Sequence, residues 1–214
     1  MTITLYHHRG ACSLAPLVAL GESGLDYQLS VVNLAGDRTE YLRVNSAGKV
    51  PALTIDDELL TENLAILYRI AAMAPAARLF PDDAAEASRQ LSLMAWFGST
   101  LHILRRQIRM PLRFTADKDA QAKLIADGQP KMWAALQELQ SRLGDREWFV
   151  GARFGVADCY ALVFYDWGLA DGFAMAELPA LTRWKARMLD RPAVRAALRE
   201  NAGPLHAEVA EQLA

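Results

Sequence analysis

The 214-residue chain carries 23 basic and 25 acidic side chains, and 52% of its residues are hydrophobic. This length and composition suit one or two globular domains whose core needs no covalent cross-links. The formal net charge of −2 provides no strong field for nucleic acid or for an anionic membrane, so neither partner is expected.

The two cysteines, Cys12 and Cys159, lie far apart in sequence and belong to no CxxC motif or Cys/His cluster. Neither a disulfide framework nor a structural zinc site is therefore expected. The start of the chain, MTITLYHH, lacks the features of a secretory signal, and no apolar stretch is long enough to span a bilayer. A reducing cytoplasm is the expected location.

The first third of the chain mixes strand and helix patterns. Residues 3–6 and 27–34 are predicted as strands, with a helix over 13–24 between them. Residues 51–55 and the ELL segment that follows Asp56–Asp57 form a predicted hairpin, and a helical pattern begins at Thr61. The expected order is β-α-β-(short helix)-β-β-α, which predicts a small mixed sheet with helices packed on it.

A polar, turn-rich stretch over 74–85 indicates a linker, and everything after it is predicted as helix. This divides the chain into a mixed domain, 1–78, and an all-helical domain, 84–214. A long helix is predicted from about Asp83 and its partner from about Asp119. The breaks that separate the further helices are expected at Pro111, Gly144, Gly155, Pro179, Pro192 and Gly203–Pro204.

The GACS segment (10–13) places a cysteine where a predicted helix begins. A cysteine in the first turn of a helix faces unpaired amides and the positive end of the helix dipole, so the pKa of Cys12 is expected to fall. The alternative is a small, inert residue in a turn. His7 and His8 are adjacent on a predicted strand and point to opposite faces, so a hydrogen-bonded or solvated pair is expected rather than a metal site.

Two later motifs could hold a peptide-like ligand. In GKVPAL (48–53), a cis bond before Pro51 would turn the main chain of Val50 outward, whereas the alternative is an ordinary edge-strand proline. In LTENLAI (60–66), Glu62 and Asn63 stand at a helix start, where amides bind carboxylates and a glutamate can receive an ammonium group. The alternative there is helix capping.

Taken in order, YHHRGACSLAP, NSAGKVPAL, LTENLAI and FGVADCYAL resemble a bacterial cytosolic glutathione transferase, with the beta class as the nearest match. The resemblance implies an α/β thioredoxin-like N-terminal domain and an all-α C-terminal domain. It implies glutathione as co-substrate, no metal, a small electrophile as second substrate, and a homodimer.

The resemblance also assigns residues. It implies a cis Val50–Pro51 bond and pairing of the Val50 main chain with the cysteinyl unit of glutathione. Glu62 and Asn63 match positions that hold the γ-glutamyl end, and Lys49 adjoins the tripeptide. The catalytic candidates are Cys12, which in the family lies beside the glutathione sulfur and can form a mixed disulfide, and His102. Tyr6 is a secondary candidate for reaching the sulfur.

Several positions depart from the family pattern. Arg9 stands where proline is usual, Ile103 where a basic residue often follows the histidine, and Asn63 where glycine or serine is common. Gly155 replaces the serine or threonine that usually opens a capping box, while Asp158 keeps the fourth position, so a half-formed box is expected. These departures bear on turnover and substrate choice and leave the predicted fold unchanged.

Three arginines follow the candidate histidine at spacings of four, three and four: Arg106, Arg109 and Arg113. On one helix they would share a stripe with His102. Such a stripe could attract an anionic electrophile or stabilise a thiolate, or it could be a solvated face or a set of ion pairs across a dimer interface.

The expected function is conjugation of the glutathione thiolate to small hydrophobic electrophiles, with mixed-disulfide chemistry at Cys12 as a further capacity. Two alternatives stay open on the sequence. One is a glutathione-dependent thiol–disulfide or peroxide reductase, and the other is a transferase-like binding protein without turnover.

Overall fold

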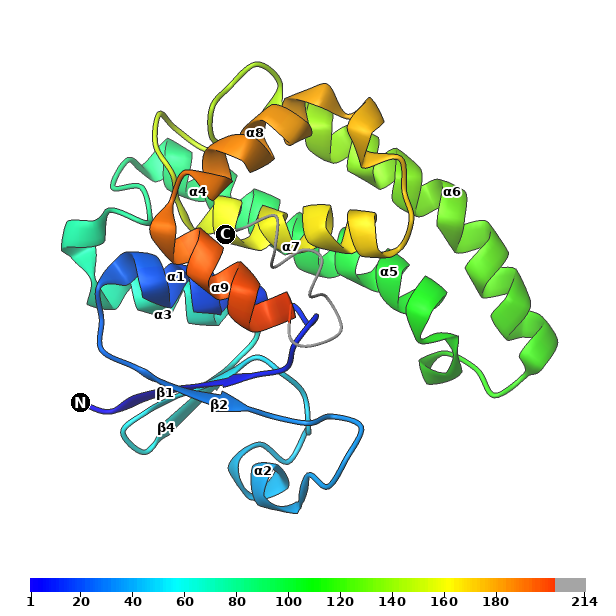
Figure 1. Ribbon diagram of the computed structural model, residues 1–214, viewed down its shortest axis with the longest axis horizontal. Coiled ribbons are helices and arrows are strands. Elements are labelled where there is room, and N and C mark those ends of the chain that lie inside the picture. The colour runs from blue at the N-terminus through cyan, green and yellow to red at the C-terminus, as the bar shows by residue number, and fades with distance from the viewer. Residues whose placement is uncertain (203–214) are drawn as a thin grey trace.

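The computed structural model describes residues 1–202, which form a four-stranded sheet with its helices followed by a bundle of helices (Figure 1). The predicted break at Gly203–Pro204 and the end of the 84–214 range lie outside the described residues.

The sheet lies where the sequence predicts it. Its order is β2-β1-β3-β4, with β1 parallel to β2 and antiparallel to β3, and with β3 and β4 as an antiparallel hairpin. The second strand is shorter than predicted, because the main chain turns at Asn33 and Gly36 N–H donates back to the Asn33 carbonyl (3.2 Å). The strands are β1 (Ile3–His7), β2 (Gln28–Val31), β3 (Ala52–Ile55) and β4 (Glu58–Thr61).

Helices cover both faces of the sheet (Figure 1). Helices α1 (Leu14–Ser23) and α3 (Asn63–Met73) pack on one face, and the short helix α2 (Thr39–Val44) lies on the other. Alternate residues of β1 are buried toward the first face, as the twofold side-chain period of a strand requires. Tyr6 points the other way, and its ring lies 5.3 Å from that of Tyr41 in α2.

After β4 the described chain is helical, as predicted. The helix expected from Asp83 runs as α4 (Ala84–Trp96), a π-helical turn (Phe97–Leu101) and α5 (His102–Arg109). No helix within residues 1–202 is long and apolar enough to cross a membrane. The remaining long helices are α6 (Lys118–Leu143), α7 (Val156–Ala170), α8 (Pro179–Leu189) and α9 (Pro192–Ala202).

Helix α7 is buried on nearly all sides, and its start explains one departure from the family pattern. Asp158 accepts hydrogen bonds from Gly155 N (3.0 Å), Phe149 N (3.1 Å) and Trp184 Nε1 (2.9 Å). Gly155 supplies no side-chain acceptor, so the capping box is half formed, as expected. A Cβ at Gly155 would lie 2.9 Å from the Leu79 carbonyl oxygen, which excludes serine or threonine without a main-chain shift.

Candidate active site

A cleft of about 300 Å³ opens between the sheet domain and helices α5 and α7. A second cavity, of about 340 Å³, lies between residues 78–83, the start of α4 and residues 150–155, and it contains none of the predicted site residues. The first cleft brings together every predicted site residue, although they are widely separated in sequence: Cys12, Lys49, Val50, Pro51, Glu62, Asn63 and His102.

Cys12 lies at the inner wall of this cleft, but its electrostatics differ from the sequence expectation. Helix α1 begins at Leu14 with Ser13 as its N-cap, so Cys12 stands before the helix rather than in its first turn. Its side chain is 6% exposed, and Sγ lies 3.6 Å from the Val50 carbonyl oxygen, to which it donates. Burial raises the pKa of the Cys12 thiol to about 11, so the expected lowering is wrong.

The Val50–Pro51 peptide bond is cis, as the resemblance implies. Side chains from α2 and from the loop after α2 hold the segment that precedes this bond. Tyr41 Oη (2.5 Å) and Asn45 Nδ2 (2.9 Å) both donate to the main-chain carbonyl of Lys49. These bonds hold the Val50 main chain at the edge of the cleft and leave the Lys49 side chain exposed.

The start of α3 forms another wall. Glu62 precedes the helix in a left-handed conformation (φ 69°), which non-glycine residues seldom adopt, and its side chain is exposed. Asn63 is the first helical residue and is 6% exposed. Its Oδ1 is buried without a hydrogen-bond partner among residues 1–202. A buried polar atom at a cleft wall is a ready contact for a ligand donor, because leaving it unpaired is costly.

His102 faces the cleft from α5. Its ring lies 5.2 Å from that of Trp167, edge to face. Burial, together with the nearby arginines Arg106 and Arg105, lowers the pKa of His102 to about 4. The imidazole is therefore neutral at neutral pH, and its ring nitrogens offer one hydrogen-bond donor and one acceptor rather than a positive charge.

The predicted arginine stripe breaks after α5. The helix ends at Arg109, and Arg113 lies in a separate 3-10 turn that begins at Pro111, so the expectation of one stripe through Arg113 is wrong. Proline lacks an N–H and disfavours helical geometry in the residue before it, which ends the helix. Arg109 Nε lies 3.5 Å from Asp171 Oδ1, whereas Arg106 lines the cleft.

Sequence reasoning missed Tyr160 and misassigned Tyr6. Tyr160 lines the cleft from α7 and is 3% exposed, and burial raises the pKa of its hydroxyl while Asn63 opposes that effect. A phenol inside the apolar VADCYAL segment was the available signal, because a buried tyrosine hydroxyl needs a polar surrounding. Tyr6 does not line the cleft, because it faces α2 on the opposite side of the sheet.

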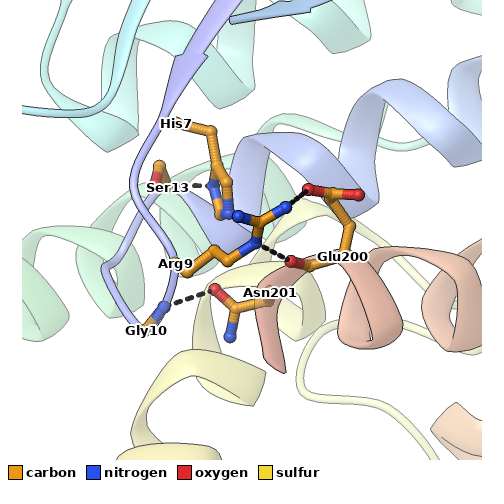
Figure 2. A network of polar contacts seen from close by, with 6 residues as sticks. All are labelled: His7, Arg9, Gly10, Ser13, Glu200 and Asn201. Carbon is orange, nitrogen blue, oxygen red and sulfur yellow. Dashed lines mark hydrogen bonds and ion pairs between the residues drawn. The ribbon is translucent and has the colours of Figure 1, made fainter. Parts of the chain in front are cut away.

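The turn before Cys12 is held from the helical domain (Figure 2). Arg9 Nη2 donates to Glu200 Oε1 (2.7 Å), and Gly10 N donates to Asn201 Oδ1 (2.9 Å), both on α9. From α7, Trp167 Nε1 donates to the Gly10 carbonyl (2.8 Å). The position of the thiol therefore depends on two helices that lie more than 150 residues further along the chain.

The two histidines that precede this turn are hydrogen-bonded, as expected. His7 Nδ1 lies 2.8 Å from Ser13 Oγ, and His8 Nδ1 lies 2.8 Å from the Val32 carbonyl oxygen. No group of three or more His, Cys, Asp or Glu side chains suited to a metal ion comes together within residues 1–202.

Comparison with known proteins identifies the family. Residues 1–72 match the model of the glutathione S-transferase N-terminal domain, and residues 100–192 match that of the C-terminal domain. The glutathione S-transferase GstA of Escherichia coli O157:H7 is 33% identical over 200 residues, which cover 91% of this chain and 96% of the relative. This chain belongs to the glutathione S-transferase family.

Solved structures agree with this assignment. The transferase superposes on a glutathione transferase homologue from Sulfitobacter with bound glutathione (TM-score 0.87, 30% identity, 93% of this chain and 98% of that chain). It also matches a beta-class transferase of Sphingomonas chungbukensis (TM-score 0.81, 37% identity, 92% and 98%). A sphingomonad transferase complexed with glutathione is 36% identical, with a TM-score of 0.81 and coverage of 94% and 99%.

Proposed function

We propose that the transferase binds glutathione in the cleft beside Cys12 and conjugates its sulfur to small hydrophobic electrophiles. The observation that carries the proposal is the meeting of three elements in one cleft: the Val50 main chain, the start of α3 at Glu62–Asn63, and the Cys12 thiol. A tripeptide offers a complement to each: a main-chain amide pair, a γ-glutamyl end and a sulfur.

Each wall of the cleft contacts a different part of glutathione in this proposal. Val50 pairs its main chain with the cysteinyl unit, and Lys49 lies beside the tripeptide. Glu62 and the unpaired Asn63 Oδ1 receive the ammonium group of the γ-glutamyl end. The first amides of α3 bind its carboxylate, since helix N-termini favour anions.

The Cys12 thiol has a supporting role at neutral pH. Because its pKa is raised to about 11, Cys12 stays protonated. When the cysteinyl unit of glutathione pairs with the Val50 main chain, the single S–H of Cys12 turns from the Val50 carbonyl to the glutathione thiolate and does not compete with it as a nucleophile. The neutral His102 is a further donor from the helical side. Both bonds favour the thiolate of glutathione over its thiol, which raises the reactive fraction.

Conjugation needs no reagent other than glutathione and the electrophile. The glutathione thiol loses its proton to solvent, and its sulfur attacks the electrophilic carbon. A carbon–sulfur bond forms, and the bond to the leaving group breaks with its electron pair on that group. The thiol–disulfide reductase alternative needs Cys12 itself as a thiolate, and the buried thiol makes it the less favoured one.

The decisive experiment measures binding and turnover in one preparation. Retention on immobilised glutathione, elution by free glutathione, and conjugation of 1-chloro-2,4-dinitrobenzene are expected. In Cys12→Ala, conjugation should persist at a reduced rate, and the intact mass should show no mixed disulfide. Absence of glutathione binding in the wild-type protein would refute the site assignment. Binding without turnover across an electrophile panel would support the non-catalytic alternative.

The assembly and the location are proposals of the same kind. A homodimer follows the family pattern, and light scattering coupled to gel filtration would measure the mass. A reducing cytoplasm suits a chain whose two cysteines, Cys12 and Cys159, are both buried and unpaired. Fractionation of the native host would test the location.

A further inference from the structure

Helix α5 carries three arginines on its last turns, and two of them are engaged elsewhere. Arg105 donates to Asp171 through Nε (2.7 Å) and Nη2 (3.2 Å), and its guanidinium lies 4.0 Å from the centre of the Trp167 ring. Arg109 lies 3.5 Å from the same carboxylate, whose side chain is 3% exposed. Asp171 thus holds both neighbours of Arg106.

Arg106 itself is half-buried and lines the cleft. Its guanidinium makes no hydrogen bond, ion pair or ring contact within residues 1–202. It is near enough to Cys12, His102 and Tyr160 to shift the pKa of each. A partly desolvated cation without a counter-ion is unfavourable, and a bound anion removes that cost.

The other charges of the cleft lie on the opposite wall. Among the lining residues, the full charges at neutral pH are Lys49 and Glu62 from the sheet domain and Arg106 from α5. In the proposed function the first two contact glutathione. Arg106 follows His102 by four residues, which places it about 6 Å further along the helix axis, one turn beyond the histidine that flanks the sulfur.

We propose that Arg106 binds a carboxylate on the second substrate, so that the cleft favours anionic electrophiles. This inference rests on the proposed function. A guanidinium pairs with a carboxylate through two parallel hydrogen bonds, which fixes both position and orientation. An aromatic electrophile with its carboxylate on Arg106 directs the opposite end of the ring toward the sulfur.

A matched substrate pair tests the charge alone. In 4-chloro-3,5-dinitrobenzoate the carboxylate lies across the ring from the leaving chloride, and 4-chloro-3,5-dinitrobenzamide has the same ring without the charge. With either one, the glutathione sulfur bonds to the chlorine-bearing carbon, chloride leaves with the bonding electron pair, and the thiol proton passes to solvent. The measured quantity is the ratio of kcat/KM for benzoate to that for benzamide at saturating glutathione.

The expected result is a ratio that falls about tenfold or more in Arg106→Gln and recovers in part in Arg106→Lys. The control is Arg89→Gln, which makes the same charge change on the exposed face of α4 and should keep the wild-type ratio. Because the ratio is taken within one preparation, partial unfolding of a variant cancels. In the wild type, added NaCl should also lower the ratio.

Two outcomes would overturn the inference and leave the proposed function intact. An unchanged ratio in Arg106→Gln would show that the carboxylate is held elsewhere. An equal loss with both substrates, together with a higher KM for glutathione, would place Arg106 on the tripeptide instead. Failure of the proposed function looks different, since the wild type would then form no glutathione conjugate from either substrate.

Discussion

The Arg9 guanidinium contacts Glu200 twice, through Nη2 to the side-chain carboxylate (2.7 Å) and through Nε to the main-chain carbonyl (3.0 Å). This pair joins the turn before Cys12 to α9 (Figure 2). A proline, which the family resemblance places here, could make neither contact. Arg9 does not line the cleft, so its departure from the family pattern concerns how the turn is held.

The two contacts of this turn with α9 should differ in strength. Arg9 and Glu200 are 42% and 37% exposed, so Arg9→Ala is expected to cost less than about 1 kcal/mol of unfolding free energy. Asn201 is 4% exposed, and Asn201→Ala leaves the Gly10 N–H without its acceptor, at about 1–3 kcal/mol. Urea denaturation measures both. Arg43→Ala is the control, because it removes an ion pair with Glu40 that is still more exposed. A larger loss of unfolding free energy for Arg9→Ala than for Asn201→Ala would contradict the burial argument.

Cys12 should be a slow thiol in the free protein. Its pKa is raised from 9.0 to about 11, so its thiolate fraction at pH 7.5 is about a hundredfold lower than that of an unperturbed thiol. Iodoacetamide should therefore alkylate Cys12 at least about a hundredfold more slowly in the folded protein than in urea, and the rate should climb up to about pH 11. Peptide mass mapping separates Cys12 from Cys159. Rapid labelling with a midpoint near pH 7 would show that helix amides outweigh burial.

Gly155→Ser should destabilise the protein, although serine is the better N-cap in general. The new Cβ would stand 2.9 Å from the Leu79 carbonyl oxygen, so the main chain at the start of α7 must shift. A net loss of about 1–3 kcal/mol is expected in urea denaturation, because the capping gain over glycine is only a few tenths. The useful comparison is Gly155→Ala, which adds the same Cβ without an acceptor and should lose at least as much.

Because His7 is buried, the free energy of unfolding should fall in acid. Its side chain is 0% exposed, and burial lowers its pKa from 6.5 to about 4. Between these values the unfolded chain binds a proton that the folded chain does not, so the free energy of unfolding falls as the pH falls from about 6.5 to about 4. The contribution of this one group reaches about 3 kcal/mol.

His7→Asn removes the titration and keeps a polar group near Ser13. Between pH 7.5 and pH 4.5, the unfolding free energy of this variant should therefore fall by about 2 kcal/mol less than that of the wild type. His8→Asn retains His7 and should keep the contribution of His7 to the pH dependence. If His7→Asn and the wild type lost stability in parallel, His7 would not be the group responsible.

The order and spacing of the motifs predict the site better than the local chemistry of each motif does. Cys12, Glu62 and Asn63 each had a plausible structural explanation in isolation, and only their order and spacing indicated one ligand. The cleft contains all three. What the motifs could not show was Tyr160, because a tyrosine in an apolar helix is usually part of the core, and whether it faces a cleft depends on how α7 packs against α1 and α3.

The order of strands and helices and the family could be predicted from the amino-acid sequence, because they follow from periodicity, turn residues and ordered motifs. The tertiary structure sets the charge state of Cys12, since burial outweighs a helix dipole that begins two residues later. It likewise decided which arginine of α5 faces the cleft, because that depends on Asp171, a partner more than sixty residues away.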